Sequence, residues 1–282
     1  MICYTRNFED VILQRVFADI AKGYYLDVGA SRPVNDNNTF ALYQKGWRGV
    51  AIEPQPDYKQ DWQQTRPEDV FLNIAAGSQP GQLTLQLYDH ARQLSSGSPE
   101  TLAHHWQCGG VKPSRNIDVP VLTLDAVIAN YLLDKPLHLL SIDVEGMEHE
   151  VLKGLDLRTH RPWVVVLEAT LPGTQISAHQ AWEPDLLASD YLLVHFDGCN
   201  RFYLAHEQRH LLELFALPPN VWDGFVMAEQ MVLQEQVKQL QAQLVNLQSI
   251  LSRTNLLSKP RDTQYALSNP TVYTYTEPQR FN

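Results

Sequence analysis

Acidic residues lie at or just after the ends of short apolar segments. These segments alternate with amphipathic segments through the first two thirds of the chain. The apolar segments cover residues 24–28, 48–52, 137–142 and 163–167, and their alternation with helical patterns predicts an α/β fold with a mostly parallel sheet and helices on both faces. Because the carboxyl ends of parallel strands meet at one edge of a sheet, the acidic residues would lie together. Unpaired carboxylates at close range repel, so a ligand site explains them better than solubility does. These residues are Asp27, Glu53, Asp143, Glu145 and Glu168.

Composition excludes several classes of protein. The chain has 282 residues with 22 Lys and Arg against 32 Asp and Glu, a formal net charge of −10 that disfavours binding to nucleic acid or anionic lipid. No apolar run approaches the roughly 20 residues that span a bilayer, so we expect no membrane span. The N-terminal residues do not form a secretory signal, which predicts a cytoplasmic protein. Three cysteines without a CxxC pair indicate neither a disulfide framework nor a zinc site.

Further elements are expected around this framework. An amphipathic helix is predicted over residues 8–20, and alternation over 83–88 predicts a hairpin arm. Thr123 is expected to cap a helix. An antiparallel pair over 191–196 and 201–205 would complete the sheet. The long aperiodic stretch 89–118 is interpreted as a lid or substrate loop.

The C-terminal part has a different pattern. From residue 226 onward apolar residues alternate at four- and three-residue steps, which predicts a coiled-coil helix over 226–257 after a catalytic domain of 1–225 and before a flexible tail of 258–282. Glutamines flank the seam in place of charges, so we expect a homo-oligomer formed through 226–257. The alternative is a helix that folds back on its own domain. The seam residues are Val226, Gln230, Leu233, Val237, Leu240, Leu244, Leu247 and Leu251.

The loop after the first apolar segment indicates the kind of cofactor. Gly29 stands without the two further glycines that bring a backbone close to a pyrophosphate, which disfavours NAD and FAD. Glu53, at the end of the second segment, can accept hydrogen bonds from both ribose hydroxyls of a nucleoside. A nucleoside without pyrophosphate indicates S-adenosylmethionine, whose cationic sulfonium would lie favourably near carboxylates.

Several motifs together resemble those of the FkbM-family methyltransferases, over about residues 7–225. The resemblance implies a class I methyltransferase fold, which is Rossmann-like, and S-adenosylmethionine-dependent O-methylation, often of a sugar hydroxyl in polysaccharide, glycolipid or natural-product biosynthesis, with S-adenosylhomocysteine as the product. The motifs are residues 25–30 (YLDVGA), 46–54 (GWRGVAIEP), 141–148 (SIDVEGME), 151–154 (VLKG) and 197–203 (DGCNRFY).

The resemblance also implies roles for individual residues. Asp27, Gly29 and Ala30 would form the loop beneath the methionine part of the cofactor, and Glu53 would hold the ribose. Asn73 resembles the residue that approaches the adenine, although an Asn at a strand end is also a common turn residue.

Methyl transfer to a sugar hydroxyl needs a base, because the hydroxyl is a poor nucleophile. Asp143 matches the position between methyl donor and acceptor, and Glu145 is next to it in the same turn. His179 has the most suitable unperturbed pKa, so the sequence leaves Asp143, Glu145 and His179 as candidates.

The acceptor and a metal complete the expected site. Glu168, Asp197 and Asn200 could hold sugar hydroxyls, and Trp182 or Trp222 could stack on a sugar ring. The oxygens of Asp143, Glu145 and Asp197 would suffice for Mg²⁺, but no metal site is predicted.

Three functions are consistent with these patterns. The first is a cytoplasmic O-methyltransferase that acts on a sugar, a glycan or a glycosylated precursor. The second is a non-catalytic, methyltransferase-like scaffold that oligomerises through its coiled coil in a glycan-synthesis complex. The third, a nicotinamide-dependent dehydrogenase, is disfavoured by the loop around Gly29.

Overall fold

A computed structural model describes residues 1–88, 95–99, 101–103, 112–171 and 173–253. The chain divides into two compact units, Met1–Met231 and Val232–Asn282, which are described separately. Parts of the expected lid or substrate loop, Cys108 and the whole of the expected tail lie outside the described residues.

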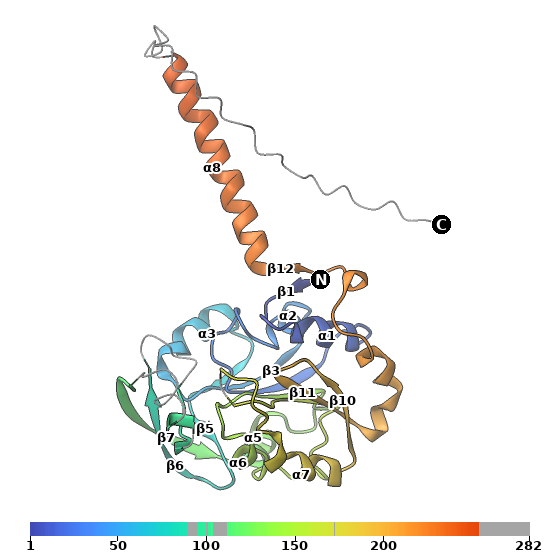
Figure 1. The fold of residues 1–282 in the computed structure, drawn as a ribbon. Coiled ribbons are helices and arrows are strands. Elements are labelled where there is room, and N and C mark those ends of the chain that lie inside the picture. The colour runs from blue at the N-terminus through green and yellow to red at the C-terminus, as the bar shows by residue number, and fades with distance from the viewer. Residues whose placement is uncertain (89–94, 100, 104–111, 172, 254–282) are drawn as a thin grey trace. The chain divides into compact units, whose positions relative to one another are not determined.

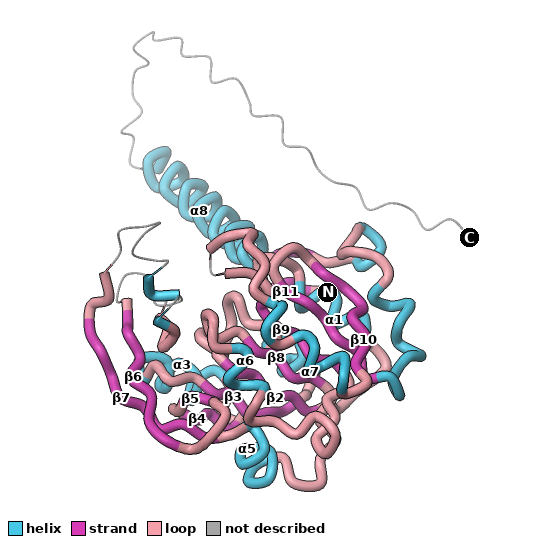
Figure 2. The backbone as a smooth tube through the Cα atoms, turned by 60° about the horizontal axis from the view of Figure 1, so that its bottom comes forward, coloured by secondary structure: helices cyan, strands magenta, loops and turns pink. Residues whose placement is uncertain are grey.

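A seven-stranded sheet forms the centre of the first unit, as far as the described residues show (Figures 1 and 2). In spatial order the strands are β10 (Tyr191–Phe196), β11 (Asn200–Ala205), β9 (Val164–Glu168), β8 (Leu139–Ile142), β2 (Tyr24–Val28), β3 (Arg48–Ile52) and β4 (Val70–Leu72). β2 pairs in parallel with β3 and β8, β3 with β4, and β8 with β9, whereas β11 pairs antiparallel with β9 and β10. The prediction of an α/β fold is confirmed, and so is the antiparallel pair near the end of the domain.

Helices cover both faces of this sheet. Apolar residues of α5 (Leu124–Tyr131), α6 (Glu148–Leu152) and α7 (Glu183–Ala188) pack with Leu26 and Val28, and those of α1 (Glu9–Val16) and α2 (Phe40–Gln44) pack with Tyr25. The alternation of β2 explains the division, because successive side chains of a strand point to opposite faces. The other helical segments are η1 (Pro56–Tyr58), α3 (Lys59–Thr65), η3 (His179–Ala181), η4 (His206–Phe215) and η5 (Val221–Asp223).

Two smaller sheets complete the first unit. β6 (Gly81–Leu87) pairs antiparallel with β7 (Arg115–Leu122), which also pairs with β5 (Ala75–Ala76), and Figure 2 shows these strands beyond β4. The hairpin arm is thus confirmed, but the expectation that 115–118 belong to a loop is wrong. Arg115, Asn116 and Asp118 are exposed, and pairing of this strand with β6 compensates for its weak apolar periodicity. β1 (Ile2–Cys3) pairs with β12 (Val226–Met227).

Helix α8 (Ala228–Arg253) carries the C-terminal seam. The expected coiled-coil segment began at Val226, but Val226 and Met227 lie in β12, because pairing with β1 uses their backbone groups. The helix therefore begins two residues later. Thr123 caps α5 as predicted, since its Oγ1 accepts from the Ala126 backbone nitrogen at 3.2 Å.

Arg66 is a buried cation at the C-terminal end of α3. Its side chain is 1% exposed, its Nε donates to Asp69 Oδ2 at 2.7 Å, and its guanidinium lies over the Trp62 ring. The same guanidinium donates to Asn37 Oδ1 and Thr39 Oγ1, both at 2.9 Å. Arg66 thus ties α3 to the segment that follows β2.

Replacing Arg66 with Met should lower the free energy of unfolding by about 3–5 kcal/mol, because Asp69 would remain buried without its partner. Urea denaturation followed by circular dichroism measures the change. Lys153→Met breaks the exposed Lys153–Glu150 pair and should change the free energy of unfolding by less than about 1 kcal/mol. Equal effects of the two variants would contradict the structural role of Arg66.

Candidate functional site

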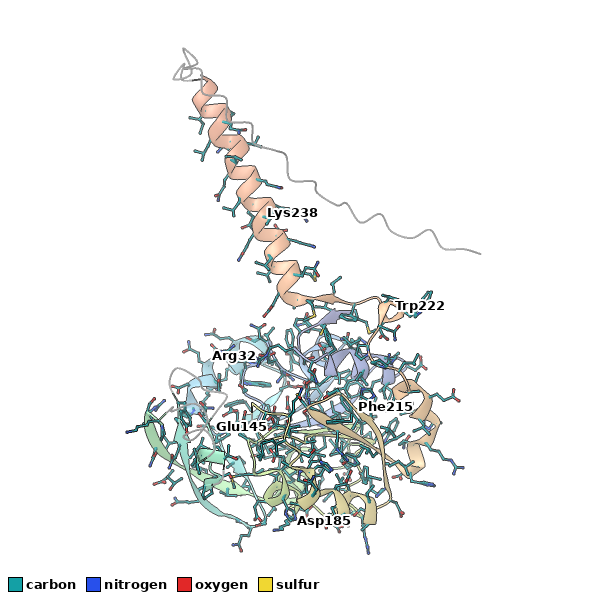
Figure 3. The ribbon with its side chains drawn as sticks, in the orientation of Figure 1. Arg32, Glu145, Asp185, Phe215, Trp222 and Lys238 are labelled. Atoms are coloured by element: carbon teal, nitrogen blue, oxygen red, sulfur yellow. The ribbon has the colours of Figure 1, made fainter. Side chains whose placement is uncertain are left out.

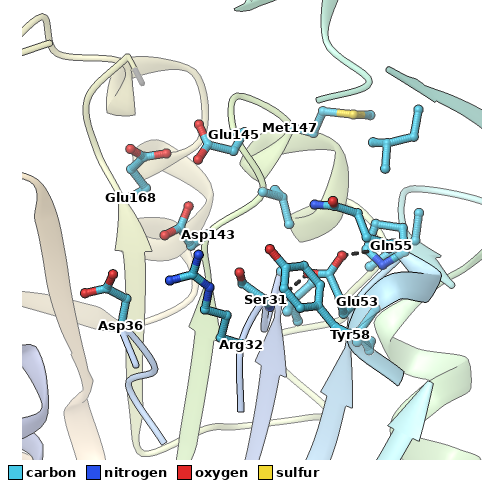
Figure 4. Close-up of a pocket in the computed structure, with 18 of the residues that line it drawn as sticks. Ser31, Arg32, Asp36, Glu53, Gln55, Tyr58, Asp143, Glu145, Met147 and Glu168 are labelled. Atoms are coloured by element: carbon cyan, nitrogen blue, oxygen red, sulfur yellow. Dashed lines mark hydrogen bonds between the residues drawn. The ribbon is translucent and has the colours of Figure 1, made fainter. Parts of the chain in front are cut away.

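A cavity of about 710 Å³ opens at the carboxyl ends of β2, β3, β8 and β9 (Figure 4). We call it the main cavity. Figure 4 shows Asp143, Glu145 and Glu168 toward one end, and Glu53 with Tyr58 toward the other. The structure thus brings together acidic residues that stand far apart in the sequence, as the strand pattern predicts.

Glu53 joins two loops that border its end of the main cavity. Its side chain is 3% exposed; Oε2 accepts from the Ser31 backbone nitrogen at 2.8 Å, and Oε1 accepts from that of Gln55 at 2.7 Å. Burial raises the pKa of Glu53 to about 7 despite these two hydrogen bonds. Each carboxylate oxygen has a second lone pair, so Glu53 can still accept from a ligand.

Gly29 allows the loop after β2 to approach the end of β8. Its φ is +77°, and a Cβ at this position would lie 1.7 Å from the Asp143 backbone oxygen. A larger residue would therefore force the two strand ends apart. This close approach places Gly29 and Asp143 side by side in the lining of the main cavity.

A second cavity of about 370 Å³ adjoins the main cavity, and we call it the side cavity. Asp27 lines it because the Asp27 side chain points to the α1 side of the sheet; Oδ2 accepts from Thr39 at 2.8 Å and from Asn37 at 3.0 Å. The two cavities share Gly29, Asp143 and Glu168, among others. The lining of the side cavity consists of Thr5, Arg6, Asn7, Glu9, Asp27, Gly29, Ala30, Asp36, Asn37, Asn38, Ser141, Asp143, Glu168, Cys199 and Asn200.

The turn that follows β8 directs two carboxyl groups into the main cavity. Glu145 has a φ of 53° and Gly146 one of 94°, a left-handed pair that a non-glycine residue rarely adopts. Glu148 Oε1 supports the turn by accepting from the Val144 and Gly146 nitrogens at 3.2 and 3.1 Å. Ser96 Oγ donates to the Glu145 backbone oxygen at 2.7 Å.

Asp143, Glu145 and Glu168 influence one another's protonation. Desolvation raises the pKa of Asp143 to about 6, and a hydrogen bond from Glu168 opposes that rise. Desolvation and the nearby Asp143 charge raise the pKa values of Glu145 and Glu168 well above the usual range. Of these groups, Glu168 therefore keeps its proton more readily than Asp143 does. The Oε2 atoms of Glu145 and Glu168 are buried and have no hydrogen-bond partner among the described residues.

Three residues that the sequence predicts for the site are absent from the described linings of both cavities. His179 lines neither cavity, and its Nε2 lies 3.6 Å from Glu183 Oε2. Asp197 lines neither cavity; it closes the turn before β11, where its Oδ1 accepts from the Asn200 backbone nitrogen at 2.6 Å. Asn73 donates to the backbone oxygens of Glu53 and Pro54 and so supports the Glu53 loop from behind.

The tryptophans proposed for sugar stacking do not line either cavity within the described residues. Trp182 is 2% exposed and belongs to the core, whereas Trp222 is 93% exposed on the surface of the first unit (Figure 3). Asn200 does line the side cavity, as does Ala30. Asp197 is not part of either lining, and the described residues include no group of three or more His, Cys, Asp or Glu arranged to hold a metal ion.

Of three supporting residues, two carried a signal that the sequence analysis did not use. Glu9 lies at helical spacing with Ile12, Leu13 and Val16, so a carboxylate occupies the apolar face of α1. Glu148 follows the predicted turn and caps it, as an acidic residue at a helix start often does. The role of Ser96 depends on a tertiary contact that no local pattern contains.

Between pH 8 and pH 5.5 the free energy of unfolding should rise by about 2 kcal/mol for each of three buried carboxyl groups. Glu9, Glu53 and Glu148 have pKa values raised to about 7, so between about pH 4.5 and 7 the folded chain binds more protons than the unfolded chain. Urea denaturation at several pH values measures this dependence.

The variant Glu148→Gln should reduce that dependence, because a Gln oxygen can keep both hydrogen bonds while the titrating group is lost. Glu213→Gln removes an exposed carboxylate and should leave the dependence unchanged. A free energy of unfolding that falls on acidification from pH 8 to pH 5.5 would contradict the assignment.

Comparison with known proteins bears on the whole site. No curated protein matches the chain. A family model described as the methyltransferase FkbM domain matches residues 27–193, a segment that begins in β2 and includes Glu53, Asp143 and Glu168. No helix among the described residues is long and apolar enough to cross a membrane. The matched segment exceeds half of the 282 residues, so the chain belongs to the FkbM methyltransferase domain family.

Proposed function

We propose that this methyltransferase transfers a methyl group from S-adenosylmethionine to a hydroxyl of a sugar, a glycan or a glycosylated precursor. The observation that carries the proposal is the main cavity, in which a buried acceptor of ribose hydroxyls, Glu53, lies across from the Asp143 carboxylate. We also propose the cytoplasm as its location, because the two described cysteines, Cys3 and Cys199, are free thiols.

The residues at the Glu53 end fit a nucleoside. Ile52, Pro54 and Ala75 give this end apolar walls suited to an adenine, and Glu53 can accept from the ribose hydroxyls. Toward the other end, the Asp143 carboxylate suits a neighbouring positive charge. S-adenosylmethionine supplies an electrophilic methyl group on a cationic sulfur when it is bound.

Asp143 is the proposed base. Because its pKa is about 6, Asp143 is ionised at neutral pH and can accept the proton of an acceptor hydroxyl. Glu168, whose pKa is raised well above the usual range, keeps its own proton beside Asp143. The three groups titrate as a set, so acidification below about pH 6 would protonate the set further and remove the base.

Glu145 and Glu168 are the proposed contacts for the acceptor. As neutral carboxyl groups they can both donate to and accept from neighbouring sugar hydroxyls. Met147, Leu83 and Leu85 border the same part of the main cavity and offer an apolar surface for a sugar ring. His179 has no place in this scheme, because it lies outside the lining of the described cavities.

Calorimetric titration with S-adenosylmethionine and S-adenosylhomocysteine tests the cofactor site. Glu53→Ala should weaken both affinities at least about tenfold, whereas Glu213→Ala, at an exposed position, should not. Asp143→Asn should keep S-adenosylhomocysteine binding and reduce transfer of a labelled methyl group to extracted glycans by about 100-fold or more.

Failure of the wild-type chain to bind either compound would contradict the proposal and favour the non-catalytic scaffold. Thermal unfolding of each variant separates a local loss of binding from a loss of fold. Full methyl transfer by Asp143→Asn would exclude Asp143 as the base while leaving the cofactor site in place.

We also propose that two copies of the chain associate through α8. Five seam residues of this helix are between 51% and 63% exposed, and an isolated helix of 26 residues that leaves such a stripe in water is marginally stable. They are Leu233, Val237, Leu240, Leu244 and Leu247.

The residues that flank the seam favour a second copy as the partner. Gln234 and Gln241 lie on one side, and Gln236 and Gln243 on the other. A side-chain amide both donates and accepts, so a glutamine row is complementary to itself, whereas selection of a different partner usually relies on opposite charges at these positions.

Light scattering on the whole chain tests this association. Leu240→Asp should halve the mass because it places a charge in the seam, and Ala242→Asp, which lies away from the seam, should not. The association should persist from 0.05 to 1 M salt, since no ion pairs across the seam are invoked. A monomeric mass for the wild-type chain at micromolar concentration would contradict the proposal.

A further inference from the structure

Glu9 is a buried carboxyl group with an unused oxygen at the wall of the side cavity. Its side chain is 8% exposed; Oε1 accepts from Asn200 Nδ2 at 2.8 Å, while Oε2 has no hydrogen-bond partner in the described part of the chain. A buried oxygen without a partner is costly, so its position in a cavity indicates a ligand.

The charges around the side cavity suit a cation. The guanidinium of Arg6 is held by Asp36 at 2.9 Å, and the other ionisable groups that the structure shows in the lining are carboxyls and a thiol. Asp27 is already satisfied by Thr39 and Asn37. Arg6 is thus the one cation in the described lining, and although its charge interacts with that of Glu9, its hydrogen bond goes to Asp36.

The amide side chains of the lining favour a ligand that donates hydrogen bonds. Asn38 Nδ2 donates to Ser141 Oγ at 3.0 Å, Asn7 Nδ2 to the Asp197 backbone oxygen, and Asn200 Nδ2 to Glu9. Because the amide nitrogens are engaged with the protein, these side chains can offer their oxygens to a ligand. A primary ammonium group has three N–H donors and a positive charge, which matches these oxygens and Glu9 together.

We propose that the side cavity binds a primary ammonium group, with Glu9 Oε2 as its counterion. The inference rests on the proposed function, because the group would belong either to the amino-acid part of the methyl donor or to an amino sugar in the acceptor. Both sources are reachable, since the side cavity shares Gly29, Asp143 and Glu168 with the main cavity. Glu9 and Asn200 lie outside the segment that matches the family model, so the contact is a property of this chain's flanking segments.

Protonation of Glu9 provides an independent signal. Burial raises the pKa of Glu9 to about 7, and the nearby Asp197 and Asp10 charges act in the same direction. An ammonium ligand would favour the ionised form, so its binding near pH 7 should release a proton. A ligand without the ammonium group should lack this part of the proton release.

Calorimetry with S-adenosylhomocysteine and 5′-methylthioadenosine tests the donor as the source, because the second compound lacks the amino acid. In Glu9→Gln the affinity for S-adenosylhomocysteine should fall about tenfold, and that for 5′-methylthioadenosine should stay within about twofold. Glu213→Gln removes one exposed carboxylate and serves as the control. Repeating the titrations of the wild-type chain in buffers of different ionisation enthalpy counts the released protons, which keeps the proposal testable if Glu9→Gln folds poorly.

A second arm tests the acceptor as the source. With the wild-type chain saturated by S-adenosylhomocysteine, glucosamine should then bind more tightly than glucose, and Glu9→Gln should abolish that preference. The proposal is overturned if Glu9→Gln leaves the difference in affinity within both pairs of ligands unchanged. It is also overturned if, in each pair, the wild-type chain releases as many protons on binding the ligand without the ammonium group as on binding the ligand with it. Absence of S-adenosylhomocysteine binding by the wild-type chain would instead refute the proposed function itself.

Discussion

Parallel pairing of β2 with both β3 and β8 brings the acidic ends of three strands to one edge of the sheet, around the main cavity. Buried carboxyl groups need hydrogen-bond donors, and backbone nitrogens supply them here. Glu53 accepts hydrogen bonds from two backbone nitrogens of neighbouring loops, and Glu148 accepts two from the turn after β8. The loops are therefore arranged around the charges, and the main cavity is the space that remains between them.

On the α1 side of β2, side chains rather than backbone nitrogens stabilise a buried carboxylate. Asp27 points to that side, and Asn37 and Thr39 connect it to the buried guanidinium of Arg66. This arrangement compensates Asp27 inside the protein, whereas Glu9, Glu145 and Glu168 each keep an oxygen without a partner among the described residues. The contrast distinguishes a carboxylate that supports the fold from carboxyl groups that are available to a ligand.

Family membership and individual character come from different parts of the chain. The segment 27–193, which matches the family model, contains the Gly29 loop, Glu53 and the acidic turn after β8. The N-terminal helix contributes Glu9, β11 contributes Asn200, and α8 carries the exposed seam, all outside that segment. Features that would adapt a shared reaction to a particular ligand and assembly therefore lie in the flanking segments.

The sequence by itself determined the alternation of strands and helices, the acidic strand ends and the heptad stripe, because these depend on the local periodicity of apolar residues. It also indicated Glu53 and Asp143, since strand ends of a parallel sheet converge whatever the details of packing. Only the tertiary structure decided that His179 and Asp197 lie outside the described cavity linings, that Val226 pairs in a strand, and that Glu9 reaches the site. Those outcomes depend on contacts between residues far apart in the chain, which spacing along the sequence does not encode.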